Sequence, residues 1–224
     1  MQRYLRALSP KAEFAIVVTL AFGLSVFSNV FALIHPIAHP AISDASLKAL
    51  LIHELVILSA LAMLLRARGW SLQRIGFAPS LRETAQGIGL ALLAYAIYVA
   101  MWFVVAWIYR RLGHVMTYPR LVAPGYSIGT ALVISAINPM FEEIFLCGYI
   151  ISALKGKYGQ WTAINISVAI RLACHLYQGV LAIIGPLPFG LLFGYSYARR
   201  GRLWPLVVAH SIVDLVGLLY YSAH

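Results

Sequence analysis

Long apolar runs alternate along this chain with short polar or basic segments. Each run approaches or exceeds the roughly 20 residues that a helix needs to cross the hydrocarbon core of a membrane. The runs cover residues 12–35, 46–66, 84–109, 127–154, 160–178, 180–198 and 203–222. The pattern therefore predicts an all-α fold, a polytopic bundle of about seven transmembrane helices. We expect residues 1–224 to form one integral membrane domain.

Two connections carry further local signals. The stretch "RARGWSLQRIGFAPS", residues 66–80, mixes arginines, a tryptophan and small apolar residues, and it predicts a short helix lying at the membrane interface. In the sixth run, Gly185, Pro186 and Pro188 predict a break or kink, because proline removes a backbone donor and collides with the preceding turn.

Composition excludes a soluble domain. The chain is 62% hydrophobic and only 11% charged, whereas soluble domains have about 45–50% apolar and about 25% charged residues. The formal charge of +10 comes mainly from the short segments between the apolar runs. That placement favours anionic lipid head groups as partners over nucleic acid. Cys147 and Cys174 lie in apolar segments and are expected to be small buried hydrophobes.

The distribution of basic residues predicts an orientation. With the N-terminus in the cytoplasm, the cytoplasmic segments hold twelve of the 17 lysines and arginines and the external segments hold four, while Arg171 lies inside a span. Positive charges gather on the cytoplasmic side of membrane proteins. We therefore expect a cytoplasmic N-terminus. The short chain, which has no signal for the endoplasmic reticulum, favours a prokaryotic plasma membrane.

Six ionisable side chains stand inside the spans that follow the third one. Such residues are rare in membranes and mark functional sites by default. At about 1.5 Å of rise per residue, all six lie about 10–21 Å from the cytoplasmic ends of their helices. Three helices can therefore bring them to one polar site. They are Glu142, Glu143, Arg171, His175, His210 and Asp214.

The spacing of these residues along the sequence indicates which of them share a helix face. His210 and Asp214 stand four residues apart, as do Arg171 and His175, so each pair shares a helix face. Adjacent glutamates point about 100° apart on a helix. One glutamate can therefore face the cavity while the other pairs elsewhere.

This set of side chains suits the hydrolysis of an amide by an activated water. A carboxylate can act as the base, and a histidine beside it can share the water. A second histidine with a polar neighbour can donate hydrogen bonds to an oxyanion. A GxSxG nucleophile motif is missing from the sequence. "HELVI" at His53 begins like a zinc-protease motif, but Ile57 takes the place of its second histidine.

Three motifs in order resemble a known family. "EEIFLC" (142–147), "RLACH" (171–175) and "HSIVD" (210–214) resemble the EExxxR, FxxxH and HxxxN/D motifs of the CPBP (CAAX protease and bacteriocin-processing, or Abi) intramembrane proteases, which are type II CAAX prenyl endopeptidase-like. The resemblance covers roughly residues 127–222, which would form the catalytic core.

The resemblance implies a role for each motif residue. Glu142 would be the base and His175 would share its water. His210 and Asp214 would form the oxyanion site, and Glu143 would orient or stabilise the other groups.

Two further expectations concern a metal and a supporting residue. No cofactor is expected, but if the family's chemistry used zinc, Glu142, His175 and His210 would be its ligands. Asn138, four residues before Glu142, can support that carboxylate with a hydrogen bond or join two helices instead.

The sequence departs from the family pattern at two positions. Cys147 replaces the arginine of the first motif, and Arg171 replaces the aromatic residue of the second. We interpret the two changes as one exchange, in which Arg171 supplies from the next helix the guanidinium that pairs with Glu143.

The predicted function is that of an intramembrane endopeptidase. In the family that the chain resembles, substrates are prenylated CAAX-type proteins, membrane-tethered proteins and small peptides. The alternative is a catalytically inactive scaffold or bacteriocin-immunity protein of the same family, with activity lost through Cys147 and Arg171. A proton-coupled transporter would normally show two related halves, and the sequence shows no internal repeat.

Overall fold

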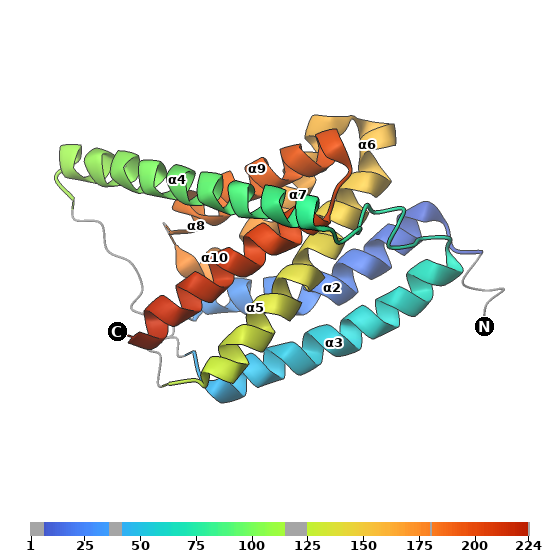
Figure 1. Ribbon diagram of the computed structural model, residues 1–224, viewed down its shortest axis with the longest axis horizontal. Helices are drawn as coiled ribbons and strands as arrows, with labels where there is room; N and C mark the ends of the chain where they lie inside the picture. The colour runs from blue at the N-terminus through green and yellow to red at the C-terminus, as the bar shows by residue number, and fades with distance from the viewer. Residues whose placement is uncertain (1–6, 36–41, 115–124, 180, 224) are drawn as a thin grey trace.

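The computed structural model describes residues 7–35, 42–114, 125–179 and 181–223, and these ranges form helices joined by turns and loops, without a β-strand. The all-α fold is as predicted (Figure 1). In chain order the helices are α2 (Pro10–Ile34), α3 (Asp44–Ala67), α4 (Leu81–Arg111), α5 (Ile128–Glu143), the π-helix η1 (Ile144–Ile151), α6 (Ser152–Tyr158), α7 (Gln160–Cys174), the 3₁₀-helix η2 (Leu176–Gln178), α8 (Leu181–Ile184), α9 (Pro186–Arg200) and α10 (Trp204–Ala223).

The helices differ in how much of a membrane they can cross. Within the described residues, α2, α3, α4 and the continuous α5–η1–α6 helix are long and apolar enough to span. Helices α7 and α9 have 15 residues each, about 22 Å, which is shorter than the hydrocarbon core of about 30 Å. The seven predicted segments thus all contain helix, but only four meet both conditions for a full span.

Serine side chains start the four long helices. Ser9, Ser43, Ser80 and Ser127 each precede the first helical residue and accept a hydrogen bond from a backbone N–H three positions on. Such caps satisfy donors that a helix start leaves unpaired. The predicted break in the sixth segment is present: α8 ends at Ile184 and α9 begins at Pro186.

The predicted short helix at residues 66–80 is wrong. Helix α3 ends at Ala67, and a run of turns leads to α4. Gly69 and Gly76 take positive φ values of 84° and 72°, which a helix does not accommodate. The carbonyl of Gly76 accepts a hydrogen bond from the N–H of Leu203. The segment is therefore a series of turns that is hydrogen-bonded to the loop before α10, and it is not a helix.

Helix α5 and its continuation η1 lie among the other helices (Figure 1). Helix α5 contacts α3 and α10, and η1 contacts α7 and α9. Every residue from Phe145 to Ile151 is buried. In contrast, large apolar side chains of α2, α3 and α4 are exposed, as expected where helices face lipid; examples are Phe27, Ile52, Leu92 and Phe103.

A close approach fixes α4 against α10. A Cβ added at Gly87 of α4 would lie 2.6 Å from the Cβ of Val208, well inside van der Waals contact. Glycine therefore lets the two backbones meet. Near the same end of α4, the indole N–H of Trp204 donates to Thr84 Oγ1 over 2.9 Å. These contacts hold α10, with two of the predicted site residues, at a fixed position.

The π-helix η1 begins directly after the two glutamates. Wide π turns leave carbonyl groups with altered partners and are often found at functional sites. Here side chains from neighbouring helices supply donors: Ser167 Oγ donates to the carbonyl of Leu146 over 2.8 Å. The Tyr197 hydroxyl lies 3.3 Å from the carbonyl oxygen of Gly148. The wide segment is thus held by α7 and α9.

Candidate active site

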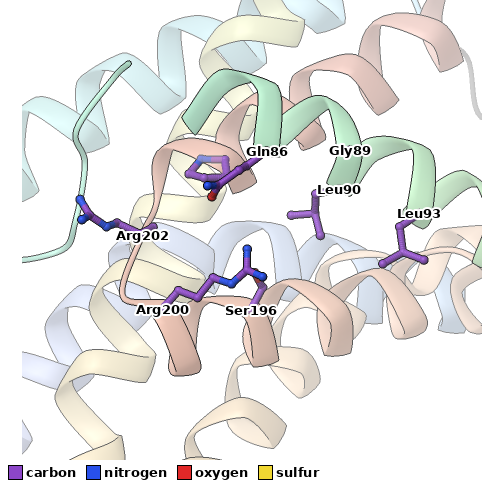
Figure 2. Close-up of a pocket in the computed structure, with 8 residues that line it drawn as sticks. Gln86, Gly89, Leu90, Leu93, Ser196, Arg200 and Arg202 are labelled. Atoms are coloured by element: carbon purple, nitrogen blue, oxygen red, sulfur yellow. The ribbon is translucent and has the colours of Figure 1, made fainter. Parts of the chain in front are cut away.

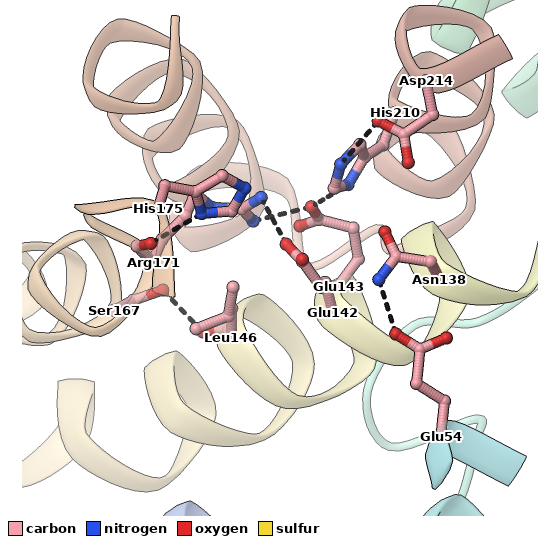
Figure 3. A network of polar contacts seen from close by, with 10 residues as sticks. All are labelled: Glu54, Asn138, Glu142, Glu143, Leu146, Ser167, Arg171, His175, His210 and Asp214. Carbon is pink, nitrogen blue, oxygen red and sulfur yellow. Dashed lines mark hydrogen bonds and ion pairs between the residues drawn. The ribbon is translucent and has the colours of Figure 1, made fainter. Parts of the chain in front are cut away.

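Three helices bring the predicted polar residues together. Glu142 and Glu143 end α5, Arg171 and His175 stand at the end of α7, and His210 and Asp214 lie on one face of α10. Ion pairs join all of them except His175, which is hydrogen-bonded to the backbone carbonyl of Arg171 (Figure 3). The structure therefore brings these residues together, as the depth estimates predicted.

Arg171 connects the two glutamates. Its Nη2 lies 2.6 Å from Glu143 Oε1 and its Nη1 lies 3.1 Å from Glu142 Oε2. The arginine is buried, and Cys147 interacts with both it and Glu143. The predicted pairing of Arg171 with Glu143 is thus present, and it places a guanidinium beside the position that the family motif gives to arginine.

Neighbouring residues of α9 make room for that guanidinium. A Cβ added at Gly190 would lie 3.3 Å from Arg171 Cδ, a tight contact. The guanidinium carbon also lies 5.4 Å from the centre of the Phe189 ring, within the range of a cation–π contact. Helix α9, which holds none of the motif residues, therefore shapes the site.

The two glutamates occupy different environments. Glu143 is fully buried, and its Oε1 accepts hydrogen bonds from Arg171 and His210. The Glu142 side chain keeps 14% of its surface exposed and has Arg171 as its ion-pair partner. Glu143 therefore serves as the anchor of the network, while Glu142 is the carboxylate that a water molecule could reach.

His210 lies between two carboxylates. Its Nδ1 is 2.8 Å from Glu143 Oε1, and its Nε2 is 3.4 Å from Asp214 Oδ1. The ring of Phe189 packs edge-on against the imidazole at 4.9 Å between centres. When the ring carries both protons, each nitrogen can donate to a carboxylate. The contact with Asp214 is long, so Nε2 is the more loosely held donor.

His175 stands apart from this network. It ends α7, and its Nδ1 lies 2.8 Å from the carbonyl oxygen of Arg171 on its own helix. A ring that donates from Nδ1 leaves Nε2 as an acceptor. In the described part of the chain no hydrogen bond joins His175 to Glu142, so the predicted pair is close in the fold but not in direct contact.

The residues do not form a metal centre in this arrangement. Among the described residues, no group of three or more His, Cys, Asp or Glu side chains is placed to hold a metal ion. Both nitrogens of His210 face carboxylates, and the Arg171 guanidinium lies at Glu142. The set Glu142, His175 and His210, which zinc would need, therefore does not fit the ion.

Asn138 binds a residue that the sequence reasoning missed. Its Nδ2 donates to Glu54 Oε1 on α3 over 2.5 Å, and it makes no hydrogen bond to Glu142 in the described structure. Glu54 is buried. The signal was present in the sequence, because a carboxylate near the middle of a 24-residue apolar helix is a functional candidate by default. Glu54 belongs to "HELVI", and the absence of a second histidine from this segment does not exclude a role for its glutamate.

Pockets on the surface lie elsewhere. One of about 230 Å³ opens between the first half of α4 and the end of α9, and none of its lining residues belongs to the polar cluster (Figure 2). It is lined by Gln86, Gly89, Leu90, Leu93, Ser196, Arg200, Arg202 and Pro205. This pocket gathers the basic side chains Arg200 and Arg202, away from the polar cluster.

Comparison with known families adds one match. Residues 124–216 match the model of the family described as type II CAAX prenyl endopeptidase Rce1-like. No curated protein and no solved structure matches the chain. The matched segment contains Glu142, Glu143, Arg171, His210 and Asp214, the residues that form the network. Over residues 124–216 this integral membrane protein is therefore similar to the type II CAAX prenyl endopeptidase Rce1-like family.

Proposed function

We propose that this protein is an intramembrane endopeptidase with its catalytic core in residues 127–222. It hydrolyses a peptide bond of a membrane-tethered or prenylated CAAX-type protein or of a small peptide. The observation that carries the proposal is the division between the glutamates: Glu143 is closed off by two hydrogen-bonded partners, whereas Glu142 keeps an accessible surface. The family match supports the same class of reaction.

Glu142 acts as the general base. Its carboxylate takes a proton from a water molecule, and the oxygen of that water attacks the carbonyl carbon of the scissile bond. Arg171 holds Glu142 Oε2 through Nη1, which fixes the carboxylate. His175 offers the free Nε2 of its ring as a second acceptor for the water. The proton then passes to the leaving nitrogen, and the peptide bond breaks.

His210 stabilises the oxyanion. Its Nδ1 is anchored on Glu143 at 2.8 Å, while the longer contact of 3.4 Å to Asp214 leaves the Nε2–H free to turn toward the negatively charged oxygen. Removing one such donor costs about 2.7–4 kcal/mol of transition-state stabilisation in serine proteases. Asp214 keeps the imidazole oriented before the substrate arrives. No metal ion takes part in this proposal.

The protein acts within the membrane and has lipids as partners. Arg82, Arg200 and Arg202 border a second open pocket of about 420 Å³, which suits the phosphate of an anionic head group. This basic end is expected to face the cytoplasm, together with the N-terminus, in a prokaryotic plasma membrane. Tags at Met1 and His224 that react only from opposite sides of intact vesicles would support this orientation.

The deciding experiment uses purified protein in liposomes with a library of membrane-tethered peptides. Wild type is compared with Glu142→Gln and His175→Ala, and Glu83→Gln serves as a control because Glu83 lies outside the cluster. We expect cleavage by wild type and Glu83→Gln, its loss in Glu142→Gln, and unchanged thermal melts. Cleavage that survives Glu142→Gln would remove the glutamate mechanism.

The inactive scaffold predicts a different result. A scaffold would cleave no peptide across a broad library, whatever residue stands at position 142. If a chelator leaves the cleavage rate unchanged, that result agrees with the proposal that no metal ion takes part. If a chelator abolishes cleavage and added zinc restores it, the proposal is contradicted.

A further inference from the structure

Glu54 is a buried carboxylate that the reaction described above does not use. It lies near the middle of α3, and only 2% of the residue is exposed. Its Oε1 accepts the hydrogen bond from Asn138, while its Oε2 is buried without a hydrogen-bond partner in the described structure. No lysine, arginine or histidine among the described residues forms an ion pair with it.

The hydrogen bond with Glu54 fixes the orientation of Asn138. A carboxylate accepts hydrogen bonds, so the amide nitrogen of Asn138 must face it and the amide oxygen must face away. Figure 3 shows that oxygen directed toward Glu143 and Asp214. Asn138 Oδ1 accepts no hydrogen bond within the described ranges. The pair therefore presents two acceptors, Glu54 Oε2 and Asn138 Oδ1, without matching donors.

The pair adjoins the candidate active site. Asn138 stands one turn before Glu142 on α5, on the same helix face. Figure 3 shows Asn138 between Glu54 on one side and Asp214 on the other. The polar cluster thus has Arg171 of α7 on one side and His210 of α10 on another. The acceptors Glu54 of α3 and Asn138 of α5 lie on a third side.

A purely structural role does not account for Glu54. Joining two helices needs one hydrogen bond to Asn138, and a glutamine at position 54 could accept it equally well. The second oxygen, Oε2, is buried without a hydrogen-bond partner in the described structure, and burying a polar atom in this way is costly. It marks a position at which a donor-rich group would gain a hydrogen bond.

Peptide hydrolysis produces such a group. Breaking the bond converts the amide N–H into a free amine, which takes up a proton and becomes a cation with three donors. We propose that Glu54 and Asn138 form a subsite that binds the amino group released by the reaction, on the side of the scissile bond opposite Arg171. The subsite rests on the proposed function, because only amide hydrolysis generates this amine.

The test measures binding apart from turnover. Protein with Glu142→Gln is used as the background, and the probes are trileucine with a free amine and N-acetyl-trileucine, titrated calorimetrically in detergent at pH 7. We expect the free amine to bind at least tenfold more tightly. Adding Glu54→Gln should bring the ratio of the two dissociation constants near one. Adding Glu83→Gln, which alters another carboxylate with an unbonded buried oxygen, should leave the ratio unchanged.

Further variants keep the test decisive. If Glu54→Gln does not fold, Glu54→Asp should keep the preference for the amine and Asn138→Ala should weaken it. Equal binding of the two peptides to the background protein, or a ratio that Glu54→Gln does not change, would overturn the subsite. Cleavage by wild type together with equal binding would reject the subsite alone. Amine preference in a protein that cleaves nothing would reject the proposed function and would leave Glu54 and Asn138 as an amine-binding site unrelated to peptide hydrolysis.

Discussion

Arg171 Nη2 and Glu143 Oε1 lie 2.6 Å apart in the interior of the bundle, and they join α7 to the end of α5. The family motif would place the arginine one turn after the glutamates on their own helix, where this chain has Cys147. The contact agrees with the interpretation that the two departures are one exchange, in which the guanidinium reaches Glu143 from the next helix. Since both members of the pair are buried, we expect the loss of either one to lower the free energy of unfolding.

A double-mutant cycle should reveal that coupling. Arg171→Ala and Glu143→Ala are each expected to destabilise the protein by about 3–5 kcal/mol, because each breaks a buried ion pair. The double variant should lose less than the sum, with a coupling of about 1 kcal/mol or more. Thermal melts or chemical unfolding in detergent provide the measurement. Strict additivity would show that the pair does not interact.

The exchange can be reversed by design. Cys147→Arg combined with Arg171→Phe would recreate the family arrangement, with arginine four residues after Glu143 on one helix face. Each single variant should be less stable than wild type, because one adds a second buried cation and the other removes the arginine that pairs with both glutamates. The double variant should melt at a higher temperature than either. A double variant as unstable as both changes added together would refute the exchange.

Glutamine substitutions should separate the two glutamates. Glu142→Gln is expected to abolish cleavage with a change in the free energy of unfolding of about 1 kcal/mol or less, because Glu142 is partly accessible and has a single ion-pair partner. Glu143→Gln should cost about 3 kcal/mol or more, because it weakens two buried contacts. Melting curves recorded beside cleavage assays compare the two. Equal stability losses would contradict the division of roles.

Gly87 and Gly89 form a matched pair of sites on α4. Gly87→Ala should destabilise the protein by about 1–3 kcal/mol, since its Cβ would lie 2.6 Å from the Cβ of Val208. A Cβ at Gly89 would meet nothing within 4 Å, so Gly89→Ala should be neutral or slightly stabilising. Thermal melts of the two variants measure the difference. Similar melting temperatures would mean that α4 does not pack on α10 at Gly87.

The sequence was most informative where polar residues interrupt apolar runs. Counting residues from the helix ends predicted that Glu143 and Arg171 lie at similar depth, and the structure brings them into contact. The same rule applies to Glu54, which is a carboxylate near the middle of the second apolar run. The direction of Asn138 could not be predicted, because whether its amide meets α3 or its own helix depends on how helices pack.

Local backbone geometry was harder to predict. Residues 66–80 have the composition of an interfacial helix, yet positive φ values at Gly69 and Gly76 make them a series of turns. The π-helix after Glu143 has no periodic signature in its sequence, since nearly every residue from 144 to 151 is apolar. Donors from other helices contact its carbonyl groups, as Ser167 does at Leu146, and such contacts cannot be read from the segment's own sequence.

The wide turns of η1 also bear on how this chain can change over time. A π turn accommodates one more residue than an α turn, so this segment can lose a residue and remain helical. Such a loss would convert the wide turn into an ordinary α turn, and the helix on either side would keep its direction and its faces. Glu142 and Glu143 would then still face Arg171, whereas a deletion in a regular part of the same helix would rotate them by about 100° relative to Lys155. The segment next to the candidate carboxylates is thus the one where this helix tolerates a change of length with the least disturbance.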